Sequence, residues 1–151
     1  MVKKSRTDVA DLLNSSAIHV LRRAREEDKA SGLSPARLSA LSVVVFRGPL
    51  PLGELAAAEG VRPATMTGIV NGLERDGLAR RRPHGADGRS VLIDATAGGK
   101  RLLARARARR IDGIAERLGD LSADQLAVLW EAGQLLEERF ALRPWQPLDL
   151  S

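Results

Sequence analysis

The chain has 151 residues, of which 44% are hydrophobic and 28% charged, and it contains no cysteine. That length suffices for one domain with an extension and for a sizeable core. The composition excludes a disordered chain, and no apolar run reaches the roughly 20 residues that span a bilayer. The missing cysteines exclude disulfides, thiolate metal sites and cysteine nucleophiles. Because acidic and polar residues interrupt the N-terminal stretch, it is not typical of a secretory signal. We therefore expect a cytoplasmic protein with no membrane partner.

Apolar residues at intervals of three and four predict four helices in the first half of the chain, over residues 8–30, 35–46, 52–59 and 63–76. Thr7 is a candidate N-cap of the first helix. Ser34 and Pro35 give the second helix a cap and a favoured first residue. Gly60 stands where a left-handed C-cap ends the third helix, and Gly77 ends the fourth. Two helices joined by a tight turn that contains glycine match the helix-turn-helix pattern.

Two strand-like runs follow this pattern, over residues 78–82 and 90–95. They flank a glycine-rich loop, which predicts a hairpin, and a hairpin directly after a helix-turn-helix forms a wing. Thr96 caps a long helix that extends to about residue 118, and a last helix begins with a Ser122–Gln125 capping box and ends at Phe140. The predicted fold class is therefore mainly α, a winged helix-turn-helix with flanking helices and one small β-hairpin.

Basic residues are concentrated in the middle of the chain. Residues 61–110 carry twelve Arg or Lys against four Asp or Glu, whereas the rest carries twelve against fifteen. Such a distribution is typical of a protein that binds a polyanion; an arginine-rich, solvated surface is the alternative. Of the four aromatic residues, none lies in this stretch, and proteins that bind single strands stack bases on aromatic side chains. The sequence therefore favours double-stranded DNA.

The second helix of such a motif enters the major groove of DNA. The outward face of the helix over residues 63–76 carries hydroxyl, amide and guanidinium groups, which can bond base edges or phosphates. An asparagine there could pair with adenine through two hydrogen bonds. The candidate contacts on and beside this helix are Arg62, Thr65, Thr67, Asn71 and Arg75, with Gly68 and Gly72 on the same face. For each of them a plain solvated position is the alternative.

The wing supplies further candidates. Arg80, Arg81 and Arg82 form a basic strand at its root, and one or two of them must point away from the core. We expect Arg80 and Arg82 to contact phosphates. Arg89 lies at the tip, and an arginine there can enter a narrow minor groove. Asp87, two residues earlier, can hold that guanidinium by a bidentate pair. The alternative is a turn in which Asp87 satisfies backbone amides.

From Leu33 to about Arg105 the chain resembles the MarR family of bacterial transcriptional regulators. The resemblance rests on the stretch from residue 48 to 100 and on Asp87-Gly88-Arg89, which matches the family's Asp-any-Arg wing motif. It implies a repressor that binds a pseudo-palindromic operator as a homodimer. In that arrangement the segments 1–33 and 99–151 supply the dimerisation helices around a DNA-binding domain over 34–98.

The resemblance also implies a small anionic or aromatic effector, bound between the dimer helices and the winged domain, that lowers DNA affinity. His19 and Arg22 could meet an anion there, with Val45 nearby; solvated or intersubunit positions are the alternative. No cofactor, metal or enzyme activity is expected, because the two histidines are 65 residues apart and no phosphate-loop or nucleophile motif occurs. A regulator without an effector, and a winged-helix module that binds a protein partner, remain alternatives.

Overall fold

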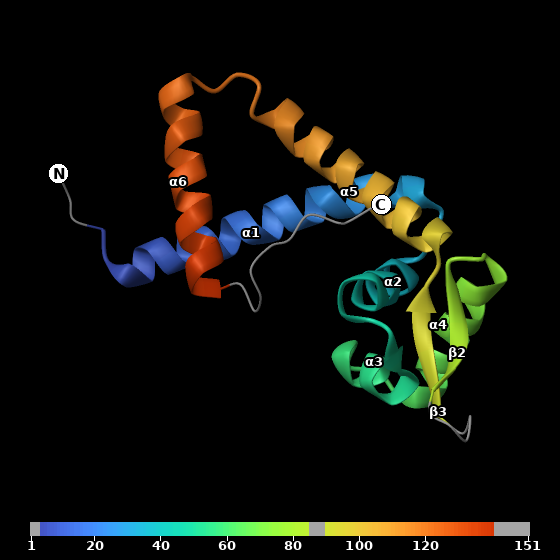
Figure 1. Ribbon diagram of the computed structural model, residues 1–151. Coiled ribbons are helices and arrows are strands. Elements are labelled where there is room, and N and C mark those ends of the chain that lie inside the picture. Colours follow the sequence, from blue (N-terminus) through green and yellow to red (C-terminus); the bar gives the residue numbers. More distant parts are fainter. Residues whose placement is uncertain (1–3, 85–89, 141–151) are drawn as a thin grey trace.

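The computed structural model describes residues 4–84 and 90–140, which fold into helices and one small sheet. In chain order the elements are α1 (Arg6–Asp28), the 3-10 helix η1 (Lys29–Ser31), α2 (Pro35–Arg47), β1 (Leu50–Pro51), α3 (Leu52–Ala58), α4 (Pro63–Arg75), β2 (Ala79–His84), β3 (Ser90–Ala95), α5 (Ala97–Arg117) and α6 (Ala123–Phe140). The elements from α2 to β3 gather into one body, from which α1, α5 and α6 extend (Figure 1). The predicted fold class, a mainly α winged helix-turn-helix, is confirmed.

The predicted helix ends are mostly confirmed. The hydroxyl of Ser34 caps α2 and that of Thr96 caps α5, each by accepting a backbone N–H from the first turn. Ser122 and Gln125 form the expected capping box before α6, with reciprocal bonds of 3.0 and 3.3 Å. Gly60 adopts a left-handed φ of 64° after α3, which costs glycine no steric penalty.

The start of α1 differs from the prediction. Thr7 lies inside the helix, and Ser5 is the N-cap. The Ser5 hydroxyl accepts the Asp8 backbone N–H at 3.1 Å, and the Asp8 carboxylate accepts the Ser5 backbone N–H at 2.8 Å. Thr7 is wrong as a cap because Ala10, three residues after it, has no carboxylate, whereas Asp8 lies three residues after Ser5 and completes a capping box. The backbone N–H of Ser5, followed by its hydroxyl, lowers the pKa of Asp8.

The core lies between the sheet and the helices α2, α3 and α4. Met66, Val70 and Leu73 of α4 are fully buried, and Ile69 packs against the same cluster. The apolar residues whose spacing predicts this helix are therefore the ones that it turns toward the core. These contacts fix which side of α4 is left facing outward.

The sheet has three antiparallel strands in the order β1-β3-β2. The hairpin of β2 and β3 was predicted, whereas β1 was not. Leu50 of β1 pairs with Ile93 of β3, and both side chains are buried. A two-residue strand is too short for alternating hydrophobicity to reveal it, so only the tertiary fold shows this third strand.

The helix α5 joins the winged body to α1. Leu103 and Ala106 of α5 form a second buried cluster with Leu38 of α2, and α5 also packs along α1. An ion pair of 3.2 Å between Arg110 and Asp28 adds to that contact. These contacts of α5 with α2 and with α1 therefore join α1 to the winged body.

By contrast, none of the residues of α1 or α6 is buried in the described part of the chain. Large apolar side chains on both helices remain exposed, among them Leu12 at 67%, Trp130 at 70% and Phe140 at 73%. Neither helix is a candidate membrane span, since the described residues contain no helix both long and apolar enough for one. An apolar helical face of this kind normally packs against another surface.

Candidate nucleic-acid interface

The outward side of α4 carries most of the side chains predicted to contact DNA. Thr65, Asn71 and Arg75 are exposed on α4, and Arg62 is its N-cap residue. The buried row of the same helix faces the core, so these side chains project away from it. The structure therefore brings four of the predicted residues together on one surface.

Thr67 lies at the edge of this surface and is half-buried. Its hydroxyl donates to the backbone carbonyl of Pro63 at 2.9 Å. The proton of Thr67 is therefore used within the helix, and the hydroxyl oxygen is left as an acceptor.

Gly72 is buried, so its predicted outward position is wrong. A Cβ at this glycine would lie 3.0 Å from Nε of Arg37, a residue of α2. The guanidinium of Arg37 reaches across the end of α4 and pairs with Asp76. The spacing within α4 cannot reveal this cover because it comes from another helix.

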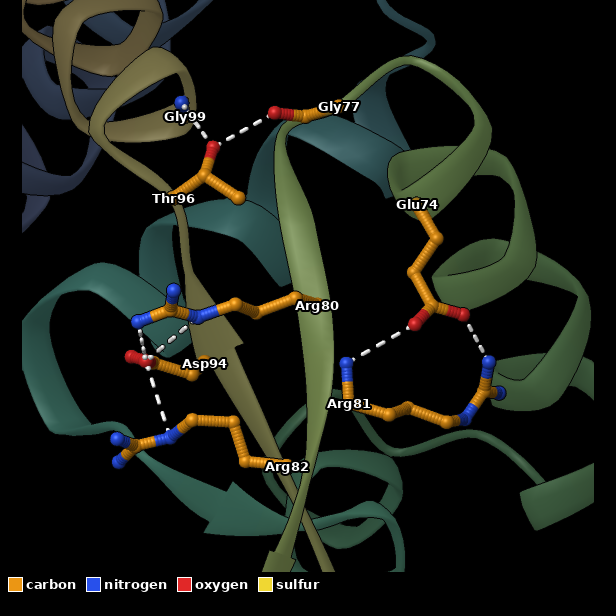
Figure 2. A network of polar contacts seen from close by, with 8 residues as sticks. All are labelled: Glu74, Gly77, Arg80, Arg81, Arg82, Asp94, Thr96 and Gly99. Carbon is orange, nitrogen blue, oxygen red and sulfur yellow. Dashed lines mark hydrogen bonds and ion pairs between the residues drawn. The ribbon is translucent and has the colours of Figure 1, made fainter.

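Arg81 connects β2 to α4. Its backbone N–H donates to one oxygen of the Glu74 carboxylate at 2.9 Å, and its guanidinium donates to the other oxygen (Figure 2). The same guanidinium donates from Nη2 to Oδ1 of Asn71 at 3.0 Å. Charge-assisted bonds of this kind are among the stronger hydrogen bonds. These hydrogen bonds therefore hold β2 against the exposed side of α4.

Arg80 and Arg82 project from the opposite face of the hairpin, as alternation along a strand requires (Figure 2). Both guanidiniums reach the carboxylate of Asp94 on β3, with N–O distances of 2.9 and 3.3 Å. The arginine side chains are 58% and 47% exposed, whereas that of Asp94 is 18% exposed. One carboxylate neutralises one guanidinium, so this group keeps a net positive charge at the surface.

Thr96 ties the end of α4 to the start of α5. Its hydroxyl donates to the carbonyl of Gly77 at 2.6 Å and accepts the backbone N–H of Gly99 at 3.0 Å (Figure 2). Gly77 has a left-handed φ of 68°, which turns the chain from α4 into β2. One side chain thus joins α4, the sheet and α5.

Comparison with known proteins assigns this arrangement to a family. A family model described as the MarR family matches residues 31–90. The chain is also 34% identical over 130 residues to an uncharacterized HTH-type transcriptional regulator of Mycobacterium leprae, and the match covers 86% of this chain and 91% of that protein. The chain belongs to the MarR family. It is accordingly a DNA-binding transcriptional regulator.

Solved structures of MarR-family and related regulators share the fold. One is the crystal structure of a transcriptional regulator from Thermotoga maritima, whose sequence is 28% identical to this chain. The two structures superpose with a TM-score of 0.77, and the match covers 91% of this chain and 100% of the Thermotoga chain. The structure of CouR from Rhodococcus jostii RHA1 bound to p-coumaroyl-CoA is 26% identical, with a TM-score of 0.57, and covers 90% and 94% of the two chains. In this chain α4 is therefore the second helix of the helix-turn-helix, the position that is called the recognition helix in this motif, and β2 and β3 are the strands of the wing.

Some of the DNA contacts predicted for this MarR-family chain do not lie beside the recognition helix. Arg80 and Arg82 lie on the hairpin face away from it, and they stay predictions as DNA contacts. Asp87 and Arg89, the wing motif, lie outside the described residues.

The predicted ligand residues are placed on two helices. His19 and Arg22 are exposed on α1, and Val45 of α2 is half-buried and packs against both core clusters. Two cavities among residues 4–84 and 90–140 lie elsewhere, along α6, where Leu129 and Trp130 line both of them. Neither cavity therefore brings the three residues together.

Arg81 and Glu74 are the residues of the interface that sequence reasoning did not select. A signal for them was present. Ala79 and Ile93 are apolar, and alternation from Ala79 puts Arg81 on the same face of its strand, the face turned toward the helices. An arginine on that face, next to a helix that ends in Glu74, predicts an ion pair between them.

Proposed function

We propose that this MarR-family protein is a homodimeric repressor that occupies a pseudo-palindromic operator and is released by a small ligand. The observation that carries the proposal is the unpartnered apolar surface of α1 and α6, with Leu12, Trp130 and Phe140 at least two-thirds exposed. Burial of about 100 Å² of such surface contributes about 2.5 kcal/mol, so a second copy supplies a strong driving force. We assign residues 1–33 and 99–151 to this dimerisation region.

A twofold dimer presents two recognition helices to DNA. Each winged domain, over residues 34–98, then binds one half-site, and the half-sites lie one helical turn apart or a multiple of it. The basic stretch over residues 61–110 supplies the attraction to phosphates that such binding requires. Occupation of a site that overlaps a promoter blocks transcription from it.

Within each half-site we assign the contacts with base edges to the side chains on the outward side of α4. Thr65 and Asn71 are its exposed hydroxyl and amide groups, and both groups can bond base edges. We assign Arg62 and Arg75, at the two ends of the helix, to contacts with phosphates, and Thr67 to an acceptor role at the flank. The surface combines positioning contacts with base contacts, as specific binding requires.

The wing carries the remaining contacts in this proposal. Arg80 and Arg82 share the carboxylate of Asp94, which holds two exposed guanidiniums at a fixed spacing. We assign them to the phosphate backbone. Asp87 and Arg89 match the family's wing motif, and we assign Arg89 to the minor groove, with Asp87 as its partner.

Ligand control is supported by the bound p-coumaroyl-CoA of CouR. That molecule is both aromatic and anionic, and His19 and Arg22 offer an imidazole and a guanidinium that could meet such an anion. Because α1 packs along α5 and α5 is joined to the winged body, a ligand bound between these dimer helices and the winged domain would shift the recognition helices. A regulator of this kind works on the chromosome, so we assign it to the cytoplasm.

The test of the dimer compares two substitutions on α1 that add the same charge. Leu12→Glu lies on the apolar side and Asn14→Glu on the polar side, roughly 200° away around the helix. In sedimentation velocity the wild type and Asn14→Glu should run as dimers, and Leu12→Glu should run as a monomer with weakened operator binding. A wild type that sediments as a monomer, or a Leu12→Glu variant that stays dimeric, would contradict the proposal.

The test of ligand control adds p-coumaroyl-CoA, and separately benzoate, to the complex of the wild type with its operator. Loss of DNA binding with either compound, reduced in Arg22→Ala, supports an effector site on α1. Binding that neither compound changes would leave the regulator without ligand control by this chemical class.

A further inference from the structure

Asn71 is the one exposed amide on α4, and its orientation is fixed from the side of the wing. Nη2 of Arg81 donates to its Oδ1 at 3.0 Å. An arginine carries donors and no acceptor. The oxygen of the Asn71 amide, and not its nitrogen, must therefore face Arg81.

Arg81 is itself held firmly enough to impose this orientation. Glu74 accepts both its backbone N–H and its guanidinium, and the two side chains are 28% and 34% exposed. Glu74 stands three residues after Asn71, on the same side of α4. Three residues from two elements thus form one connected group, in which the Nδ2 amino group of Asn71 is the part left for another molecule.

The orientation limits which base edge the amide can read. An asparagine reads adenine by accepting from N6 with its oxygen and donating to N7 with its nitrogen. With Oδ1 turned to Arg81, Asn71 offers two N–H donors instead. The base that presents two acceptors in the major groove is guanine, through O6 and N7.

We propose that Arg81 is a specificity-determining residue that turns Asn71 into a donor, so that Asn71 selects guanine over adenine in each half-site. The inference rests on the proposed use of the outward face of α4 in the major groove. It replaces the adenine pairing that the sequence alone suggests for Asn71. Arg81 acts as a positioning residue, since its own guanidinium is engaged with Glu74 and Asn71.

The experiment is a selection of binding sites from a random-sequence duplex DNA library by the full-length protein. Wild type, Asn71→Ala and Arg81→Met are compared, with Arg82→Met as the matched control from the neighbouring strand position. Wild type should prefer guanine at one position of each half-site, and Asn71→Ala should lose that preference. Arg81→Met should prefer adenine there by about tenfold, since a bidentate pair discriminates by about 1–3 kcal/mol.

The control separates specificity from affinity and from folding. Arg82→Met should bind all sequences more weakly but keep the preference for guanine. Should Arg81→Met fail to fold, the wild type is tested on a selected site that contains 7-deazaguanine, which lacks the N7 acceptor. Its affinity should fall several-fold, whereas the affinity of Asn71→Ala should not change.

The outcomes distinguish this inference from the proposed function. A selection that enriches no sequence overturns both. A clear operator in which wild type prefers adenine at the Asn71-dependent position overturns the inference alone. The same holds if folded Arg81→Met keeps the wild-type preference, or if 7-deazaguanine leaves wild-type affinity unchanged.

Discussion

Replacement of Gly99 by alanine should destabilise the protein, although the same change at Gly68 should stabilise it. Both glycines lie in helices, where alanine is favoured over glycine by up to about 1 kcal/mol. A Cβ at Gly68, on the outward side of α4, meets nothing within 4 Å. Gly68→Ala should therefore gain this helix propensity without a clash. A Cβ at Gly99 would lie 2.1 Å from the backbone oxygen of Leu78 and 3.1 Å from Cδ1 of Leu41.

The magnitude follows from this geometry. Ordinary contact begins at 3.4 Å, so Gly99→Ala must separate α5 from the backbone before β2 by more than 1 Å. Overpacking costs about 1–3 kcal/mol, and a clash with backbone belongs at the upper end. After the gain in helix propensity, the net loss is about 2 kcal/mol. At about 2–4 °C per kcal/mol, Gly99→Ala should melt about 4–8 °C below the wild type.

The assay is thermal unfolding followed by circular dichroism, with all variants at one protein concentration. Gly68→Ala should melt about 2–4 °C above the wild type. A Gly99→Ala variant as stable as the wild type would refute the close approach of α5 to Leu78. A Gly68→Ala variant that loses stability would refute the open outward face of α4.

Three further predictions concern the wing and the start of α1. Arg89→Ala should weaken specific DNA binding by about 1–3 kcal/mol at matched salt; unchanged affinity in filter binding would remove its role in the groove. Arg82→Ala should weaken binding to operator and scrambled DNA alike, and should lower the slope of log affinity against log salt by about 1; a loss confined to the operator would contradict a phosphate contact. The Asp8 carboxyl, whose pKa is lowered from 3.8 by the N–H of Ser5, should titrate below that value by NMR. The ionised carboxylate should stabilise α1 fully above the pKa that Asp8 has in the unfolded chain, and this stabilisation should be lost as pH falls through the pKa in the folded chain. Asp8→Asn should abolish this dependence of stability on pH.

The parts of the fold that depend on local signals could be predicted from the sequence. Ser34 and Thr96 are caps because their hydroxyls bond the first turn that follows. The apolar spacing of α4 identifies Met66, Val70 and Leu73 as its buried row. These features are set within a few residues, where propensity and periodicity are reliable guides.

The parts that failed depend on contacts between distant segments. Gly72 is buried by Arg37, which lies 35 residues earlier in the chain. Glycine has a low helix propensity, yet the close approach of Leu78 requires it at position 99 of α5, a contact that no local pattern shows. The hydrogen bond from Arg81 to Asn71 likewise joins two elements, so no pattern within α4 could show which atoms of the Asn71 amide are free.

Binding of the purified protein to the DNA upstream of its own gene, against scrambled DNA of the same length, tests the central claim most directly. The titration is repeated across a series of salt concentrations. The account predicts a clear preference for the upstream fragment, with one dimer per site and affinity that falls steeply as salt rises. Equal, weak binding to both fragments would contradict an operator at that promoter and would favour the basic surface as a non-specific one.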